Sequence, residues 1–278
     1  MLDEFNALLK NDTWCLVPRL ACVNVVTRKW IFRHKLHPDV SLARYKARLV
    51  LRGFTQQGGI AYTETFSSVV KPATVRVVLS LATAHSWPIH QMDVKNAFLH
   101  GTLGETIYCN QPAGFLDSSR PTHVCLLKKS LYGLKQVPRT WFLWFQAFLL
   151  SLGFNASKCD TSLFMFRHRS AIAYLLLYMD DIILTANTTC ALHSIISSLK
   201  FEFFNLGDIH HFLGVNVTRS THGLFLSQQQ YILEILDRAK MRNCNLIDTP
   251  VDTKSKLSAN AGASVPDPTL SRSLAGTL

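Results

Sequence analysis

The sequence lacks the features of a secreted, disulfide-bonded or zinc-binding protein. Its seven cysteines are odd in number and widely spaced, without a Cys-x-x-Cys pair, which indicates reduced thiols in an intracellular protein. The N-terminal residues contain no basic stretch followed by an apolar one, so we expect no secretory signal. His210 and His211 are adjacent, and His34 and His37 have no cysteine nearby, so the sequence predicts no zinc site.

Acidic side chains are scarce. The 278 residues include 18 Asp and Glu against 29 Lys and Arg, a formal net charge of +11. Between Arg28 and Arg52 there are eight Lys and Arg and one acid, Asp39, so most of the excess lies in one segment. Such a cluster favours an acidic partner, most simply nucleic acid, and the alternative is a solvated basic surface. With 48% hydrophobic and 17% charged residues, wholesale disorder is excluded.

Apolar periodicity and turn residues predict mixed helices and strands without an internal repeat. The expected helices share apolar side chains at helical spacing: residues 2–9, a helix that Pro72 opens, a very apolar one from Trp141 to Leu152, residues 190–204, and one that Ser227 caps. The expected strands share apolar or alternating runs: residues 29–36, 44–52, 89–93 and 212–215, the first two joined by a turn at 37–39. Beyond Asp248 the composition predicts a loose tail.

The strand expected at residues 44–52 has two distinct faces. Side chains alternate between the faces of a strand, so Arg44, Lys46, Arg48 and Arg52 face one way. The intervening residues are Tyr45, Ala47, Leu49 and Leu51, which form an apolar back. Phosphate binding is the interpretation that we favour for the cationic face, and an exposed sheet face is the alternative.

Asp180 and Asp181 lie between two apolar runs within residues 171–186. Two strands joined by a tight turn place both acids at a hairpin tip, where a bound divalent cation is the natural partner. An ordinary exposed Asp-Asp turn is the alternative. A membrane span is not expected, because the run is short and carries acids at its centre.

Asp93 ends another short strand, so three carboxylates become candidates for one site. Phosphoryl transfer by two divalent ions needs this chemistry, because carboxylates bridge the metals. All the expected ligands are hard oxygens, which favours Mg²⁺, with Mn²⁺ as the alternative.

Six ordered motifs resemble the reverse transcriptase region of copia-type retrotransposon polyproteins, and the match covers nearly the whole chain. The motifs are Arg-Tyr-Lys-Ala-Arg-Leu-Val (44–50), Gly-Phe-Thr-Gln-Gln (53–57), Gln-Met-Asp-Val-Lys-Asn-Ala-Phe-Leu-His-Gly (91–101), Ser-Leu-Tyr-Gly-Leu-Lys-Gln (130–136), Tyr-Met-Asp-Asp (178–181) and Phe-Leu-Gly-Val (212–215). Pro138 and Arg139 extend the fourth motif.

The resemblance implies an α+β fold, a right-hand polymerase with fingers, a palm of antiparallel sheet plus helices, and a partial thumb. The reverse transcriptase domain is expected at residues 1–248, with fingers at about 20–85 and 102–140, palm at about 86–101 and 141–217, and partial thumb at about 218–248. Residues 249–278 are expected to form a loose, truncated connection segment.

The resemblance also implies roles for single residues. Asp93, Asp180 and Asp181 match the metal-binding aspartates, with the carbonyl of Val94 as a further ligand. Nucleotide contacts are implied for Lys46, Arg48, Phe98, Tyr132 and Gly133, where Phe98 matches the aromatic side chain that excludes a 2′-hydroxyl. The primer grip is implied at Phe212, Leu213, Gly214 and Val215. On the residues alone, Phe98 would more often be a core aromatic and Tyr132 a packing residue, and Gly214 could mark a β-bulge.

The implied function is RNA-directed DNA synthesis on an RNA template with a DNA primer and deoxynucleoside triphosphates. No membrane partner is expected, and the implied location is intracellular, in cytoplasmic particles, the nucleus or both. Ser67-Ser68, Gly104 with Thr106, and Val40 depart from the family pattern, but none removes a carboxylate. The chain shows no protease, integrase or ribonuclease H segment, so it resembles a fragment. The alternatives are an inactive nucleic-acid-binding remnant and a chain that is never stably made.

Overall fold

The computed structural model describes residues 1–21, 23–36, 41–199, 203–221, 223–245 and 268–276. The chain divides into two compact units, residues 1–209 and 210–278, and each is considered by itself. Mixed helices and largely antiparallel sheets make the fold α+β, as predicted. None of the helices in the described ranges is both long and apolar enough to cross a membrane.

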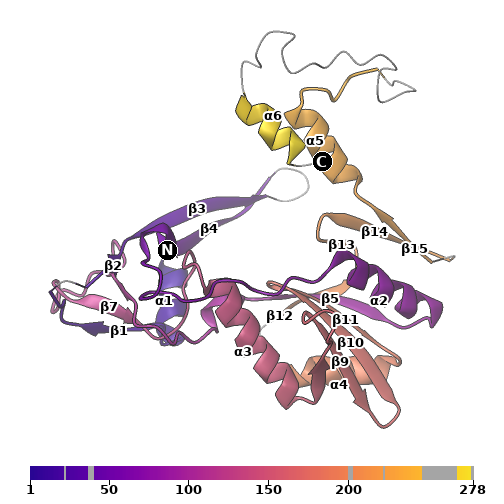
Figure 1. Ribbon diagram of the computed structural model, residues 1–278, viewed down its shortest axis with the longest axis horizontal. Coiled ribbons are helices and arrows are strands. Elements are labelled where there is room, and N and C mark those ends of the chain that lie inside the picture. The colour runs from indigo at the N-terminus through magenta and orange to yellow at the C-terminus, as the bar shows by residue number, and fades with distance from the viewer. Residues whose placement is uncertain (22, 37–40, 200–202, 222, 246–267, 277–278) are drawn as a thin grey trace. The chain divides into compact units, whose positions relative to one another are not determined.

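A six-stranded sheet forms the largest layer of the first unit, and all its neighbouring strands are antiparallel. The strand order is β12-β5-β11-β10-β9-β8 (Figure 1). The strands are β5 (Ile89–Val94), β8 (Phe154–Ala156), β9 (Leu163–His168), β10 (Ala171–Tyr178), β11 (Asp181–Ala186) and β12 (Phe203–Asp208). Consecutive residues of β10 and β11 are buried, so both faces of these central strands are covered, which explains their continuous apolar sequence.

Helices α3 (Val137–Ser151) and α4 (Thr189–Ser198) pack into one hydrophobic core with this sheet (Figure 1). Trp141, Phe145 and Leu149 follow one another at four-residue spacing on α3, and all three are buried in that core. Proline occupies the first turn of α3, and Gly153, with a φ of 92°, follows its end. A further helix, α2 (Pro72–Ala84), buries residues 78, 79 and 82.

A second core lies under a smaller sheet with the strand order β1-β7-β6-β2. The strands are β1 (Trp14–Val17), β2 (Val25–Val26), β6 (Tyr108–Cys109) and β7 (Val124–Leu127), and only β2 and β6 pair in parallel. Helix α1 (Leu2–Lys10) contributes Leu8, which is fully buried in this core. The six cysteines in the described ranges are all free thiols, and Cys22 lies outside these ranges.

The basic hairpin is a separate two-stranded ribbon, β3 (Arg28–Leu36) with β4 (Leu42–Leu51), which projects as an arm (Figure 1). Arg33 pairs with Lys46 across the ribbon, so the structure adds Arg33 to the predicted cationic face. The predicted apolar back is correct only near the base, where Leu49 and Leu51 are buried. Nearer the tip, Tyr45 is 75% exposed.

Two glycines join the base of β4 to the loop before α3. The Leu51 N–H donates to the Tyr132 carbonyl at 2.7 Å. A Cβ atom placed on Gly53, in the short helix η1 (Gly53–Thr55), would overlap the carbonyl oxygen of Gly133. A Cβ atom on Gly133 would in turn overlap the Leu51 carbonyl oxygen, and Gly133 has a φ of 92°. The two segments can approach this closely because neither glycine has a side chain.

The second unit contains a three-stranded sheet and two helices. The strands are β13 (His211–Phe212), β14 (Val215–Ser220) and β15 (Gly223–Ser227), in the order β13-β14-β15. The helices are α5 (Gln229–Arg238) and α6 (Pro268–Ala275).

Most of the predicted helices and strands are confirmed with small shifts at their ends. Arg52 lies just beyond β4, and the predicted turn at residues 37–39 lies outside the described ranges. The helix predicted at 190–204 is wrong in its second half: α4 ends at Ser198, and β12 begins at Phe203. Residues 203–208 pair with β5, and this distant partner overrides the helical spacing.

Two further predictions fail in the second unit. Ser227 does not cap α5, because it is the last residue of β15 and Gln228 precedes the helix. Residues 249–278 are not loose throughout, because α6 occupies Pro268–Ala275, and residues 249–267 lie outside the described ranges. A short helix with few apolar residues gives a weak periodic signal, so composition alone missed it.

We expect Gly53→Ala to lower the free energy of unfolding by about 1–3 kcal/mol, because the added methyl group forces two backbones apart. Urea denaturation measures the change. The matched control is Gly104→Ala, since a Cβ atom there meets nothing within 4 Å. Both substitutions remove the same conformational freedom, so equal stabilities of the two variants would show that the close contact is unimportant.

Candidate active site

The three predicted carboxylates meet at one end of the six-stranded sheet. Tyr178 and Asp181 are the last pair of the β10–β11 hairpin, and Met179 and Asp180 form its turn. Asp181 also lies opposite Asp93 on the neighbouring strand β5. The Val94 N–H donates to the Asp180 carbonyl at 2.9 Å, which ties the turn to β5. All three aspartates are half-buried.

The local sequence explains why these acids end up together. Leu177 and Ile182 flank the turn and are almost fully buried, as is Met92 before Asp93. The apolar residues of these strands are therefore buried close to the acids, and the acids themselves lie at the edge of the core. The hairpin tip predicted for Asp180 and Asp181 is confirmed.

Three residues predicted to contact the nucleotide form a second group. The Arg48 guanidinium lies 4.4 Å from the centroid of the Tyr132 ring, a cation–π contact. The Phe98 and Tyr132 rings meet edge to face, with centroids 5.9 Å apart. Phe98 is only partly buried and touches both hydrophobic cores, so it lies where the cores meet. Its carbonyl accepts a hydrogen bond from the Ser130 hydroxyl.

The pKa of Tyr132 links this group to the carboxylates. Burial raises the pKa of Tyr132 to about 12, against the opposing effect of Arg48. Smaller upward contributions to this pKa come from Glu4, Asp180 and Asp93. The charges of Asp93 and Asp180 therefore act on the Tyr132 hydroxyl, which places the carboxylates and the aromatic group in one region.

Gly133, which is also predicted to contact the nucleotide, lies in the loop before α3. Its backbone packs against Leu51 and Gly53, as described above, so it fixes the position of Tyr132 at the base of β4. Lys46 lies two residues from Arg48 on the same face of β4, farther from the buried base. Side-chain contacts therefore join Arg48, Tyr132 and Phe98. Gly133 and Lys46 are connected to this group through the backbone, Gly133 by its packing against Leu51 and Lys46 as a neighbour of Arg48 on β4.

Sequence reasoning missed two residues of this region. Glu4 of α1 is partly buried, and burial raises its pKa, although Arg48 and Lys46 lower it. The Glu4 Oε1 atom is buried without a hydrogen-bond partner. Trp141 donates its indole N–H to the Met179 carbonyl at 2.7 Å. In the sequence, nothing distinguishes Glu4 from any other polar residue of a helix. The sequence predicts Trp141 to be a core aromatic residue, and its burial confirms this, but the sequence does not predict its hydrogen bond to Met179.

The residues fit a divalent cation in their donor chemistry. Asp93 and Asp181 stand in register on adjacent strands and Asp180 lies in the turn beside them, and clustered carboxylates repel one another until a cation binds. In the described part of the chain, no group of three or more His, Cys, Asp or Glu side chains is close enough to enclose an ion. The donor chemistry and the backbone positions nevertheless suit a divalent cation.

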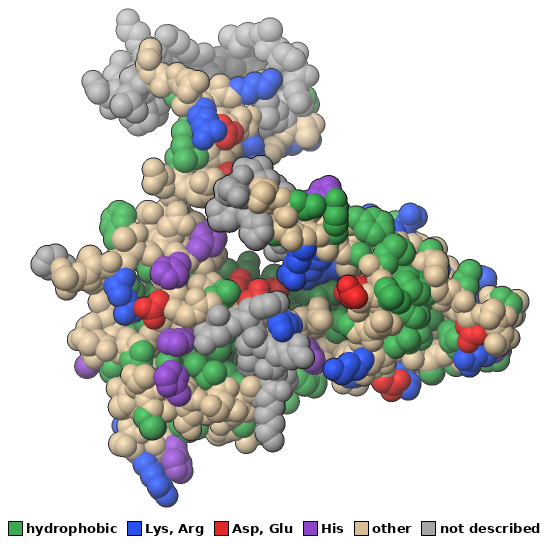
Figure 2. Space-filling view, turned by 180° about the vertical axis from the view of Figure 1, so that it is seen from behind, with side chains coloured by type: hydrophobic (Ala, Val, Ile, Leu, Met, Phe, Trp, Pro, Cys, Tyr) green, Lys and Arg blue, Asp and Glu red, His purple; other side chains and the backbone are tan. Residues whose placement is uncertain are grey.

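Charged side chains separate by sign around the first unit. Figure 2 shows Asp and Glu side chains gathered near the centre of the view, beside a group of Lys and Arg side chains. The sequence predicts phosphate binding for the cationic face of β3 and β4, and cation binding for the carboxylates of the sheet. Opposite charges at separate places suit a ligand that carries phosphates and also binds a cation.

The predicted primer grip, residues 212–215, belongs to the second unit and is therefore described by itself. The strand predicted there is wrong. Phe212 ends β13 and Val215 starts β14, and Leu213 and Gly214, with φ values of 52° and 74°, form the turn between them. A two-residue turn needs left-handed backbone, which glycine supplies. Gly214 is a turn residue and not the β-bulge considered as an alternative.

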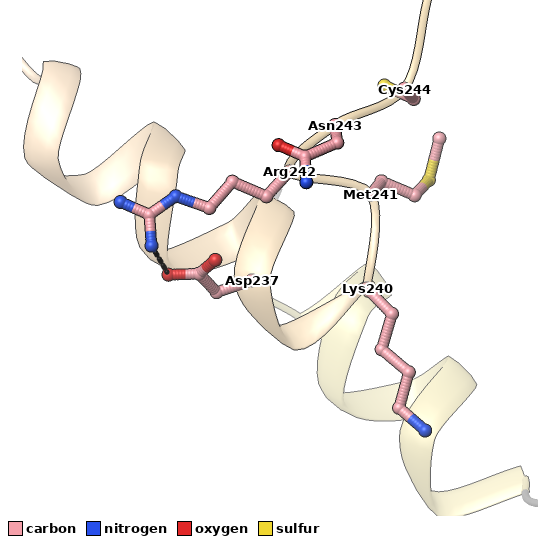
Figure 3. A pocket seen from close by; sticks show the side chains of 6 residues that line it. All are labelled: Asp237, Lys240, Met241, Arg242, Asn243 and Cys244. Carbon is pink, nitrogen blue, oxygen red and sulfur yellow. Dashed lines mark hydrogen bonds and ion pairs between the residues drawn. The ribbon is translucent and has the colours of Figure 1, made fainter.

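A pocket of about 360 Å³ lies at the end of α5 in the second unit. Its lining comes from one short stretch of chain: Asp237, Lys240, Met241, Arg242, Asn243 and Cys244 (Figure 3). Arg242 pairs with Asp237 at 3.3 Å, and both side chains are largely exposed. No predicted site residue lines this pocket, so its shape gives no support to a catalytic role.

Comparison with known proteins gives one family. A profile described as "Reverse transcriptase (RNA-dependent DNA polymerase)" matches residues 11–253. The retrovirus-related Pol polyprotein from transposon RE2 of Arabidopsis thaliana is 45% identical over 281 residues, which cover 100% of this chain and 19% of the relative. The corresponding polyprotein from transposon TNT 1-94 of Nicotiana tabacum is 38% identical over 263 residues, with coverages of 93% and 20%. The chain spans about a fifth of the length of these curated relatives.

Among solved structures, a foamy viral protease–reverse transcriptase in complex with double-stranded DNA matches 83% of this chain and 35% of that chain. The identity is 14% and the TM-score is 0.39, a similarity too loose to support an inference.

Tyr132 generates a pH prediction. The Tyr132 pKa is about 12 in the folded state and about 10 in the unfolded state, so the folded chain keeps this proton longer. The stability that depends on it is fully present below pH 10 and is lost as the pH rises through 12, by roughly 2–3 kcal/mol. We expect urea denaturation at pH 9 and pH 11.5 to show a smaller loss for Tyr132→Phe than for the parent. Equal losses would contradict the burial of this hydroxyl beside the acids.

Proposed function

The chain belongs to the reverse transcriptase (RNA-dependent DNA polymerase) family, and we propose that its first unit carries the nucleotidyl transfer site for RNA-directed DNA synthesis. By family it is an RNA-directed DNA polymerase, and its relatives are Pol polyproteins of copia-type retrotransposons. The observation that carries the proposal is the register of Asp93 against Asp181 beside the Asp180 turn.

The proposed reaction extends a DNA primer on an RNA template. The 3′-hydroxyl oxygen of the primer bonds to the α-phosphorus of a deoxynucleoside triphosphate, the bond to the bridging oxygen breaks, and pyrophosphate leaves. The proton of the hydroxyl passes to solvent. Divalent cations, Mg²⁺ or Mn²⁺, activate the attacking hydroxyl and neutralise the leaving group when bound.

Different residues of the chain are proposed to bind the cations, the triphosphate, the sugar and the primer. Asp93, Asp180 and Asp181 would hold the cations, with the Val94 carbonyl as a further ligand. Lys46 and Arg48 bind the triphosphate, and the cation–π contact with Tyr132 keeps the Arg48 guanidinium at the base of the ribbon. Phe98 and Tyr132 lie at the sugar, where the Phe98 ring excludes a 2′-hydroxyl. Residues 212–215 of the second unit act as the primer grip, through the turn at Leu213 and Gly214.

A second candidate is a nucleic-acid-binding remnant without catalysis. The observation that favours it is that the described residues include no group of three or more His, Cys, Asp or Glu side chains that could hold a metal ion. A primer-extension assay with the purified protein on an RNA template separates the two candidates, because only the polymerase lengthens the primer.

We expect Asp180→Asn and Asp93→Asn each to abolish primer extension and to leave binding of an RNA–DNA duplex nearly unchanged. The amide keeps the shape of the side chain but removes the negative charge that a divalent cation needs. Gel-resolved extension and fluorescence anisotropy measure the two properties. The matched control is Asp3→Asn, an exposed acid of α1, which should extend at the rate of the parent. Extension by either active-site variant at that rate would refute the metal assignment.

We expect Phe98→Ala to raise incorporation of ribonucleotides relative to deoxynucleotides, because a methyl group leaves room for the 2′-hydroxyl. The readout is the ratio of the two incorporation rates for each folded molecule. Phe166→Ala is the control, since Phe166 is partly buried against the same core but lies on β9. An unchanged ratio in Phe98→Ala together with a lowered melting temperature would make Phe98 a packing residue, at a cost of about 3–5 kcal/mol.

A further inference from the structure

The turn between β10 and β11 is held in an unfavourable backbone conformation. Met179 has a φ of 53°, in the left-handed region that non-glycine residues rarely adopt. Met179 is 41% exposed, so close packing of this residue does not explain the conformation. A turn strained in this way keeps its shape only where surrounding contacts determine it.

Both carbonyl groups of the turn accept hydrogen bonds from outside the hairpin. The Met179 carbonyl accepts the Trp141 indole N–H of α3 at 2.7 Å, and the Asp180 carbonyl accepts the Val94 N–H of β5 at 2.9 Å. Two adjacent peptide groups are therefore fixed from two directions. Because the Asp180 Cα atom lies between these two peptide groups, the contacts also fix the direction of its Cα–Cβ bond.

Trp141 is itself held in place. It is 1% exposed, and its ring stacks on Phe145 with centroids 5.1 Å apart and on Trp144 at 5.6 Å. A buried indole N–H normally has a partner, and here the partner is the Met179 carbonyl. The ring can change neither its rotamer nor its depth without disturbing the core, so it acts as a rigid donor.

Helix α3 connects this donor to the loop that carries Tyr132 and Gly133. The loop runs into α3, which starts at Val137. Just before the helix, the Gln136 side chain is buried and donates to the Ala61 carbonyl at 2.9 Å. The segment from Tyr132 to Trp141 is thus anchored at both ends, by the Leu51–Tyr132 hydrogen bond and by the indole contact.

We propose that Trp141 is a positioning residue that holds the turn of Met179 and Asp180 in the geometry needed for divalent cation binding. The inference rests on the proposed function in that Asp180 and Asp181 are taken as cation ligands. It goes further in assigning part of the rigidity of the turn to one hydrogen bond, the one that comes from α3. Trp141 touches neither substrate nor cation, so its effect passes through the Met179 carbonyl.

The test compares Trp141→Phe, which keeps an aromatic ring but removes the donor, with Phe145→Leu. Phe145 stacks on Trp141 and is fully buried, so the control disturbs the same core without removing the indole N–H. The first readout is hydrogen–deuterium exchange of the peptide that covers residues 177–183. We expect exchange to rise roughly five- to tenfold in Trp141→Phe, the change that one lost hydrogen bond produces, and to stay near the parent value in Phe145→Leu.

The second readout is the affinity of the purified protein for Mn²⁺, used as a spectroscopic probe without nucleic acid. We expect a several-fold weaker affinity in Trp141→Phe than in Phe145→Leu. In primer extension, kcat at low Mg²⁺ should fall and recover at high Mg²⁺, while KM for the nucleotide and Kd for the duplex stay constant. The two proposals can fail separately. If Trp141→Phe changes hydrogen exchange and Mn²⁺ affinity but the parent never extends a primer, the role of Trp141 is supported and the proposed polymerase function is refuted.

If Trp141→Phe fails to fold, replacing Trp141 by β-(3-benzothienyl)alanine keeps the bicyclic ring and substitutes sulfur for the N–H. The same exchange and Mn²⁺ measurements then apply. Unchanged exchange and affinity in the variant without the donor would overturn the proposal. Equal changes in that variant and in Phe145→Leu would also overturn it, because Trp141 would then act only as a core residue.

Discussion

The pairing of β5 with β11 is the constraint on which the candidate site depends. Asp93 and Asp181 come from segments 88 residues apart, and only this register places them opposite each other. A slip by one residue would turn every side chain of β5 to the other face of the sheet, so Met92 would leave the core and Asp93 would enter it. The full burial of Met92 and Ile182 therefore fixes the positions of the acids. Hydrophobic burial sets the register, and the register positions the charges.

A second contact joins the basic ribbon to this sheet region. The ribbon on its own is a two-stranded structure, which is marginally stable in water. Its base is held by the approach of Gly53 to Gly133 and by the hydrogen bond from Leu51 to Tyr132. Arg48 then reaches the Tyr132 ring, which also touches Phe98. Cationic, aromatic and acidic groups thus occupy one region because two glycines allow close backbone packing.

The sequence predicted elements that depend on local patterns and on the resemblance to a family. The hairpin of Asp180 and Asp181, the strand before Asp93 and helix α3 are such elements. It failed where a distant partner decides the conformation, as at residues 203–208, which pair with β5 instead of extending α4. It also failed at Leu213, where the left-handed turn is made by a residue that rarely adopts it. The roles of Glu4 and Trp141 depend on contacts between segments, and no pattern along the chain reveals them.

The strand order of the large sheet has a consequence for the time course of folding. β5 lies between β12 and β11, which are made about a hundred residues later, whereas β10 and β11 are joined by a short turn. The β10–β11 hairpin can close in microseconds, but β5 must wait until both neighbours have left the ribosome. Until then β5 exposes two unpaired edges and an apolar face, which are the features that promote aggregation. The arrangement that brings Asp93 to its partners therefore makes this part of the sheet the last to assemble and the most exposed during synthesis.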